Sequence, residues 1–196
     1  MFVHIDKPEY DRGSGTTDID ELWSHLRRGD ERALSELYCV SYAWLFSYGY
    51  RIVPQEAFVK DAMQDLFLIL WEKRNRINKA RSVRSYLRSA LRRLIFRRMR
   101  KQNNRTRRNH DYGQEHDVEL RNMEELIIGF ELDEERKKRL ALAIRTLSKR
   151  QKEAIHLKYY DGFSNTEIAK IMDINKQSVY NHVSKAISKM QNFVQE

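Results

Sequence analysis

The sequence predicts an all-α fold, arranged as two small helical domains joined by a flexible acidic linker. Three observations lead to this prediction. Apolar residues recur at three- and four-residue intervals along most of the chain, as on the buried side of helices. Only seven Gly and two Pro occur in 196 residues, too few for the many tight turns of an all-β fold. Finally, an acidic segment separates two helical halves of the chain. A length of 196 residues is enough for two small domains.

Composition also limits the function classes. The net charge of +9 suits a polyanionic partner, nucleic acid first and an anionic membrane surface second. The longest uninterrupted apolar run, 66–71, is far too short to span a membrane. The N-terminus lacks the basic start and apolar core of a secretory signal, and the single Cys39 fits a reducing compartment. We therefore expect a cytoplasmic protein without membrane insertion.

The first elements are delimited by capping residues. Residues 1–16 are polar and are expected to form a flexible tail. A first helix is capped by Thr17 or Asp18 and ends at Gly29, in the usual C-terminal position of glycine. A second helix follows over residues 31 to about 50, where large apolar residues repeat with helical spacing.

The helix predicted over 56–74 has two dissimilar faces. One face is apolar and is expected to be buried; it holds Val59, Ala62, Met63, Leu66, Phe67 and Leu70. The opposite face carries acidic and amide groups, and Leu68 lies in the middle of them. Leu68 has two interpretations. It is either an ordinary exposed leucine or the apolar centre of a docking surface with an acidic rim, suited to a basic partner.

Residues 72–108 are strongly basic, with sixteen Lys or Arg and one acid. A loop is expected over 75–80, and Ser82 can cap a helix over 83–101. Apolar residues cover one side of that helix, and the remaining positions are largely Arg. A solvated basic face is one reading of this pattern, but a surface that contacts phosphates explains the clustered cations better. Tyr86 and Phe96 are expected mainly in the core, although either can stack on bases.

The segment 106–135 is predicted to be the linker. Residues 102–122 are polar and irregular, and nine acids but only one Lys or Arg lie between Glu115 and Glu135. A short helical piece is expected within the linker, over about 123–130.

The C-terminal part shows a helix-turn-helix pattern. After a helix over 136–147, capping-box sequences begin helices at Ser148 and Ser164. The second of these helices is short and is followed by a turn over 173–175 and a last helix from 176 to about 192. A short helix, a tight turn and a longer helix are typical of DNA-binding modules, although a purely structural helical hairpin has the same outline.

The outer face of the last helix carries side chains suited to reading bases. Gln and Asn pair bidentately with adenine in the major groove, Ser is a versatile partner, and Lys holds phosphates. The residues expected on or beside this face are Lys176, Gln177, Ser178, Tyr180, Asn181, Ser184 and Lys185.

Catalytic and cofactor-binding patterns are not found. The chain has no Gly-rich phosphate loop, and its six His are scattered, without paired Cys or His at metal-ligand spacing. We therefore expect no enzymatic activity, no metal site and no cofactor.

Taken together, these parts resemble the alternative sigma factors of the extracytoplasmic-function type, in the sigma-70 superfamily. The resemblance covers roughly residues 20–192. Residues 61–74, DAMQDLFLILWEKR, are similar to the polymerase-binding motif of sigma domain 2; residues 85–101, to the helix for the −10 promoter element; and residues 147–190, to sigma domain 4, which reads the −35 element. The resemblance implies a sigma domain 2 over 17–105 and a sigma domain 4 over 136–196.

The resemblance also implies partners and residue roles. The expected partner is core RNA polymerase, with its β′ and β subunits. The surface that grips the coiled coil of β′ would lie at or beside Asp61, Gln64, Asp65, Leu68 and Trp71. The −10 DNA would be held by Asn75, Asn78, Arg81, Tyr86, Arg92, Arg93, Arg97 and Arg100, and the −35 DNA by the face of the last helix. An anti-sigma factor is a further expected partner. Each domain alone should bind DNA weakly, so the free protein is expected to bind promoters poorly and the polymerase-bound form specifically.

Two departures from the family pattern affect these expectations. Tyr86, Arg93 and Arg97 stand where many members have Trp, Asn and Asp, so the −10 sequence preference is not transferred. Asp173 stands where such turns often have Gly, which predicts an altered or strained turn.

Three other functions fit the sequence less well than that of a sigma factor. The main alternative is a free-standing helix-turn-helix regulator acting as a dimer, but no heptad seam for dimerisation is present. A recombinase or nuclease would need a folded α/β domain, and a basic RNA- or membrane-binding protein leaves the capped helix-turn-helix pattern unexplained.

Overall fold

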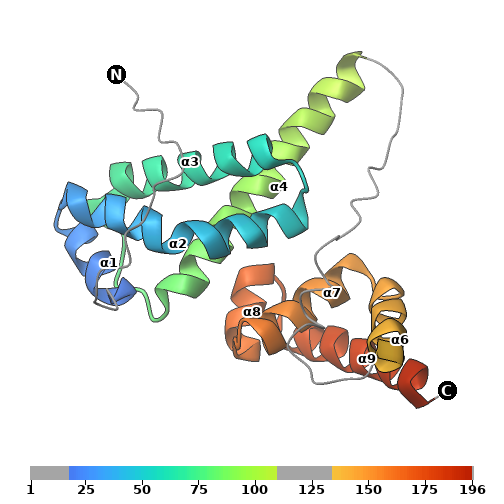
Figure 1. The fold of residues 1–196 in the computed structure, drawn as a ribbon. Coiled ribbons are helices and arrows are strands. Elements are labelled where there is room, and N and C mark those ends of the chain that lie inside the picture. The colour runs from blue at the N-terminus through green and yellow to red at the C-terminus, as the bar shows by residue number, and fades with distance from the viewer. Residues whose placement is uncertain (1–17, 110–133, 196) are drawn as a thin grey trace.

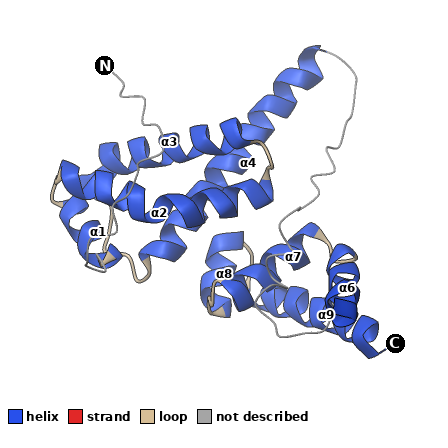
Figure 2. Ribbon diagram, viewed as in Figure 1, coloured by secondary structure: helices blue, strands red, loops and turns tan. Residues whose placement is uncertain are grey.

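The computed structural model describes residues 18–109 and 134–195. The predicted tail over 1–16 and the predicted helical piece over 123–130 lie outside these residues. Within them the chain consists of helices and connecting loops (Figure 2), so the predicted all-α class is confirmed.

Two bundles are formed, and we name them by their helices. The N-terminal bundle contains α1 (Ile19–Arg27), α2 (Glu31–Ile52), α3 (Glu56–Lys73), a short 3₁₀ turn (Arg74–Arg76) and α4 (Val83–Asn109). The C-terminal bundle contains α6 (Glu134–Arg145), α7 (Lys149–Ile155), a π-helical turn (His156–Tyr160), α8 (Asn165–Met172) and α9 (Lys176–Gln195). In Figure 1, α4 crosses behind α2 and α3, and its C-terminal end extends beyond both.

The helix starts follow from local capping. The carboxylate of Asp18 accepts a hydrogen bond from the amide of Asp20, and that of Asp30 accepts from Arg32 and Ala33. Both predicted capping boxes are confirmed, because Ser148 and Ser164 each exchange reciprocal hydrogen bonds with the residue three positions later. Gly29 has a φ of 93° and ends α1 in the left-handed conformation that glycine adopts without strain.

The core of the N-terminal bundle lies where α2, α3 and α4 meet. The predicted apolar face of α3 is buried there, with Val59 and Leu66 inside. Gly49 of α2 permits the close approach of these helices, because a Cβ at this position would lie 2.7 Å from Cγ1 of Val59. Trp23 of α1 packs edge-on against Tyr86 of α4, with ring centroids 5.0 Å apart, so Tyr86 has the structural role expected for it.

Two predicted helix boundaries differ from the structure. α4 continues to Asn109, past the expected end at 101 and into the start of the predicted linker. Residues 102–109 contain neither Gly nor Pro, so no residue interrupts the intrahelical hydrogen bonds. α6 spans Glu134–Arg145 rather than 136–147, and the chain then tightens into turns that still bury Leu147.

The helix-turn-helix of the C-terminal bundle has the predicted outline. α8 and α9 are joined by a turn in which Asp173 adopts the left-handed conformation, with φ 54° and ψ 51°. Asp is one of the few residues other than Gly that reaches this conformation at modest cost. The departure from Gly therefore leaves the turn intact, and Val179 and Val183 of α9 are buried.

His156 is buried where the C-terminal bundle meets α2 and α4. Its Nε2 lies 2.5 Å from Nη1 of Arg51 and 3.4 Å from Oδ2 of Asp161, and its ring stacks on Tyr160. Burial, together with the charges of Arg51 and Arg88, lowers the pKa of His156 from 6.5 to about 3. The imidazole is therefore neutral in the folded protein at physiological pH.

We expect the free energy of unfolding to fall by about 1 kcal/mol between pH 7.5 and 5.5 because of His156. In this range the unfolded chain binds a proton at His156 while the native chain, with its lowered pKa, does not. Burial raises the pKa of Asp161, and this change acts in the opposite direction. Urea unfolding at three pH values should show a shallower pH dependence for His156→Gln than for the wild type. Identical pH dependences would contradict the assignment.

Candidate nucleic-acid interface

The polar face of α3 is accessible, with Leu68 at its centre. The Leu68 side chain is 49% exposed, Asp61 and Gln64 are exposed, and Asp65 and Trp71 are half-buried. An exposed leucine surrounded by polar groups is consistent with both interpretations of this face. Exposure alone does not decide between them.

Arg98 of α4 already pairs with the acids of this face, which sequence reasoning missed. Its guanidinium donates to Oδ2 of Asp65 at 2.8 and 3.0 Å and to Oδ2 of Asp61 at 3.3 Å. All three side chains are partly or well exposed, so these pairs contribute little to stability. The pairing instead orients the two carboxylates along the rim. Trp71 is likewise covered on one side, because the guanidinium of Arg74 lies 4.2 Å from its ring centroid.

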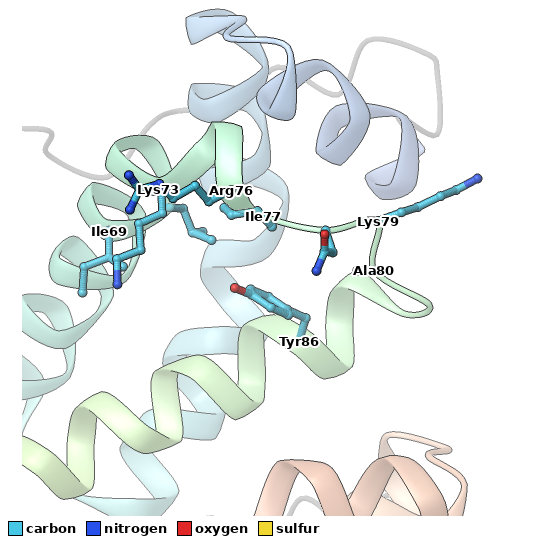
Figure 3. A pocket seen from close by; sticks show the side chains of 9 residues that line it. Ile69, Lys73, Arg76, Ile77, Lys79, Ala80 and Tyr86 are labelled. Atoms are coloured by element: carbon cyan, nitrogen blue, oxygen red, sulfur yellow. The ribbon is translucent and has the colours of Figure 1, made fainter.

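A hollow of about 300 Å³ opens between the end of α3, the following loop and α4 (Figure 3). It is lined by Ile69, Leu70, Lys73, Arg76, Ile77, Asn78, Lys79, Ala80 and Tyr86. Apolar side chains and the Tyr86 ring form much of its wall, and Lys79 points away from it toward solvent (Figure 3). This arrangement can accept a flat apolar ring next to an anionic group. Of the lining residues, only Asn78 and Tyr86 belong to the predicted site.

The loop that borders the hollow is held by α1. The Nε of Arg27 donates to the carbonyl of Ile77 at 2.8 Å, and the indole of Trp23 donates to the carbonyl of Asn78 at 3.4 Å. At the other end, the Ser82 hydroxyl accepts from the amide of Ser85 at 3.2 Å and caps α4. The backbone of the loop is thereby fixed, while Asn75, Asn78 and Arg81 present exposed side chains.

The predicted arginines of α4 separate onto two faces. Arg93, Arg97 and Arg100 are exposed, as their helical spacing allows. Arg92 is not: it is 5% exposed and pairs with Glu153 of α7. A direct DNA contact by Arg92 is therefore not available in this arrangement, because the C-terminal bundle covers that face of α4.

The predicted reading face of α9 is open to solvent. Lys176, Gln177, Tyr180, Asn181, Ser184 and Lys185 are exposed, and Ser178 is half-buried. The Gln177 side-chain amide donates to Oδ1 of Asn181 at 3.3 Å, one helical turn away. Asn175 caps the helix by accepting from the amide of Ser178 at 2.7 Å. The two amides therefore stand side by side on the surface, at the N-terminal end of α9, where such helices meet base edges.

The described residues offer neither a metal-binding cluster nor a membrane-spanning helix. In residues 18–109 and 134–195, no group of three or more His, Cys, Asp or Glu is placed to hold a metal ion. Among the helices of the same part of the chain, none is both long enough and apolar enough to cross a membrane.

Comparison with known families matches both bundles. The model of Sigma-70 region 2 matches residues 38–105, and that of Sigma-70 region 4 matches residues 137–190. A curated relative, the extracytoplasmic-function RNA polymerase sigma factor SigK of Mycobacterium sp. strain JLS, is 25% identical over 179 residues, which are 90% of this chain and 91% of the relative.

Solved structures share the fold. CnrH, in complex with the cytosolic domain of CnrY, is similar with a TM-score of 0.57 and 18% identity, over 91% of this chain and 98% of CnrH. The sigma factor RpoE of Bartonella quintana, in complex with the anti-sigma factor NepR, is similar with a TM-score of 0.56 and 18% identity, over 84% of this chain and 98% of RpoE. Since regions 2 and 4 follow in order and together match more than half of the chain, the protein belongs to the sigma-70 family, as a sigma factor of the extracytoplasmic-function type.

Proposed function

We propose that this sigma factor binds core RNA polymerase and directs transcription initiation by opening −10 DNA and reading the −35 element. The observation that carries the proposal is the exposed amide pair Gln177 and Asn181 on the second helix of a helix-turn-helix, in the same chain as the cation-rimmed hollow beside α4. The two features serve different forms of DNA, one double-stranded and the other single-stranded.

The polar face of α3 is the proposed polymerase-binding surface. The exposed Leu68 side chain provides an apolar contact at the centre, which a partner would bury. Around it, the acids held by Arg98 form a negatively charged rim suited to a basic partner. Of the two interpretations of Leu68, we therefore favour docking, because the neighbouring basic surfaces are suited to DNA instead.

The hollow is the proposed site for an unstacked base of the −10 element. A base inserted there meets the Tyr86 ring and aliphatic side chains. The adjoining phosphates would be attracted by Arg76, which lines the hollow, and by Lys79, whose side chain extends from the hollow into solvent. Together with the exposed arginines of α4, these contacts offset part of the free energy needed to separate the strands.

The α9 face is the proposed reader of the −35 element. In this role Gln177 and Asn181 contact base edges in the major groove, and Lys176 and Lys185 hold the flanking phosphates. We also propose an anti-sigma factor as a partner, since RpoE, which shares this fold, was solved in complex with the anti-sigma factor NepR.

Run-off transcription from a set of genomic promoters tests the function directly. Core polymerase with this protein should give promoter-dependent transcripts that core polymerase alone does not give. The double variant Gln177→Ala, Asn181→Ala should weaken the binding of polymerase-bound protein to these promoters by about 2 kcal/mol or more, because each bidentate base contact contributes about 1–3 kcal/mol. The yield of promoter-dependent transcript should fall accordingly. Absence of any promoter-dependent transcript would refute the proposal.

Leu68→Glu should weaken binding to core polymerase by about 2 kcal/mol, roughly thirtyfold in Kd, without loss of helix content. The matched control is Leu142→Glu, since Leu142 is 53% exposed on α6, outside the proposed surface. Affinity can be measured by fluorescence anisotropy and folding by circular dichroism. Equal effects of the two substitutions, or unfolding of Leu68→Glu, would show that this face of α3 is not a docking surface.

Lys79→Ala and Arg76→Ala should each weaken the binding of polymerase-bound protein to promoter DNA and lower the slope of log Kd against log salt by about one. Lys60→Ala serves as the control, because Lys60 is an exposed cation of α3 that pairs with Glu56 and lies outside the hollow. A salt slope that changes no more than in the control would exclude phosphate contacts at the hollow.

A further inference from the structure

Helix α1 contacts two walls of the hollow, although none of its own residues lines it. The Nε of Arg27 donates to the carbonyl of Ile77 at 2.8 Å, and the indole of Trp23 donates to the carbonyl of Asn78 at 3.4 Å. The Trp23 ring also packs edge-on against Tyr86, with ring centroids 5.0 Å apart. One buried side chain of α1 therefore touches both the loop and the aromatic wall of the hollow.

The middle of the loop has little other support. At its start, the amide of Ile77 donates to the carbonyl of Lys73 at 3.1 Å, and at its end the Ser82 hydroxyl caps α4. Within residues 18–109 and 134–195, the backbone over 78–81 makes no hydrogen bond other than the one from Trp23. The conformation of this segment therefore depends on α1.

The bonds from α1 also fix the direction of two amide groups. No peptide bond among the described residues is cis, and in a trans peptide the N–H points opposite to the preceding C=O. Since the carbonyls of Ile77 and Asn78 face α1, the amides of Asn78 and Lys79 point away from it. Neither amide has an acceptor in the described part of the protein, and both residues line the hollow. The loop thus presents two backbone donors beside the proposed base site.

We propose that Trp23 and Arg27 are positioning residues for the captured −10 base, on which they act through the loop without touching DNA. They hold the amides of Asn78 and Lys79 in place to donate to acceptor atoms on the edge of the base, while the Tyr86 ring stacks on its face. This inference deepens the proposed function and rests on it, since it takes the hollow to be the base site.

Bracing the loop before DNA arrives removes an entropy loss from binding. Ordering one backbone residue lowers an equilibrium constant by about tenfold, and a loop that is already held in its bound conformation avoids this loss. Bracing also fixes the positions of the donors, so a base whose acceptors do not meet them leaves the amides unpaired. We therefore expect α1 to raise both the affinity for the −10 strand and the discrimination between bases.

Substitutions at two neighbouring arginines of α1 separate bracing from charge. Arg27→Met keeps much of the aliphatic stem and removes the donor to Ile77, whereas Arg27→Lys keeps a donor and a positive charge. Arg28→Met is the matched control, because it makes the same change in charge at an exposed position. The Nε of Arg28 donates within α1, to the carbonyl of Ser24, and not to the loop.

Trp23→Phe provides a second variant of the brace. It removes the indole donor to Asn78, while an aromatic ring stays next to Tyr86. Because Trp23 is buried, circular dichroism verifies that this variant is folded. If it is not, the half-buried Arg27 carries the test alone.

Relaxation of the backbone amide nitrogens in the free protein tests the bracing itself. In the wild type, the order parameters of Asn78 and Lys79 should be about 0.85, as in a rigid backbone, and in Arg27→Met they should fall below about 0.6. Arg27→Lys and Arg28→Met should keep the wild-type values. Low order parameters in the wild type, or values that do not change in Arg27→Met, would overturn the bracing.

Binding of forked promoter DNA to polymerase that carries each variant tests base recognition. One strand of the −10 segment is left unpaired and its bases are replaced in turn, and the captured base is the one at which the wild type discriminates most. Arg27→Met and Trp23→Phe should raise Kd for the preferred base about tenfold and leave Kd for disfavoured bases nearly unchanged. Arg27→Lys should keep the wild-type discrimination, and Arg28→Met should change Kd for all bases by the same factor.

A merely structural role of α1 predicts a different result. Destabilisation of the N-terminal bundle would lower the active fraction of the protein and raise Kd equally for every base. It would also weaken the binding to core polymerase, which the braced-loop inference leaves unchanged. Wild-type discrimination between bases in folded Arg27→Met would therefore overturn the inference.

The wild-type protein separates failure of this inference from failure of the proposed function. If wild-type and variant complexes bind forked DNA and discriminate between bases equally well, the inference alone is rejected. If the wild-type complex shows no promoter-dependent binding, the proposed function is rejected and the inference is rejected with it.

Discussion

Three sides of helix α4 lie in three different environments, and the rest of the structure depends on which residues of α4 lie on each side. Leu87, Leu91 and Ile95 point into the core of the N-terminal bundle. Arg88 and Arg92 pair with acids of the C-terminal bundle. The third side, with Arg93, Arg97 and Arg100, faces solvent. A rotation of about 100° per residue separates these sides, so a basic helix can be firmly anchored and still present cations.

Much of the fold could be predicted because its signals are local. Helical periodicity and both capping boxes are properties of neighbouring residues, and the structure confirms them. Exposure of Leu68 followed from periodicity alone. The predicted end of α4 at residue 101 was wrong. The polar segment after it was expected to be irregular, although no residue in 102–109 breaks a helix. The extra length carries the basic helix into the start of the predicted linker.

The remaining features depend on contacts between residues distant in the sequence. The pairing of Arg98 with Asp61 and Asp65 and that of Arg92 with Glu153 bring together helices with no common sequence signal. The hollow is formed by the end of α3, a loop and the Tyr86 ring of α4. Its shape depends on the packing of Trp23 against that ring and on the hydrogen bonds from α1 to the loop. Residue type could thus indicate which side chains bind DNA, but not which are already engaged within the protein.

The most direct test of this account is an electron-microscopy structure of the full chain with core RNA polymerase and promoter DNA. We expect Leu68 to lie against the polymerase and Gln177 and Asn181 to lie in the major groove of the −35 DNA. A complex in which the face of α3 around Leu68 remains in solvent would contradict the central claim of polymerase docking.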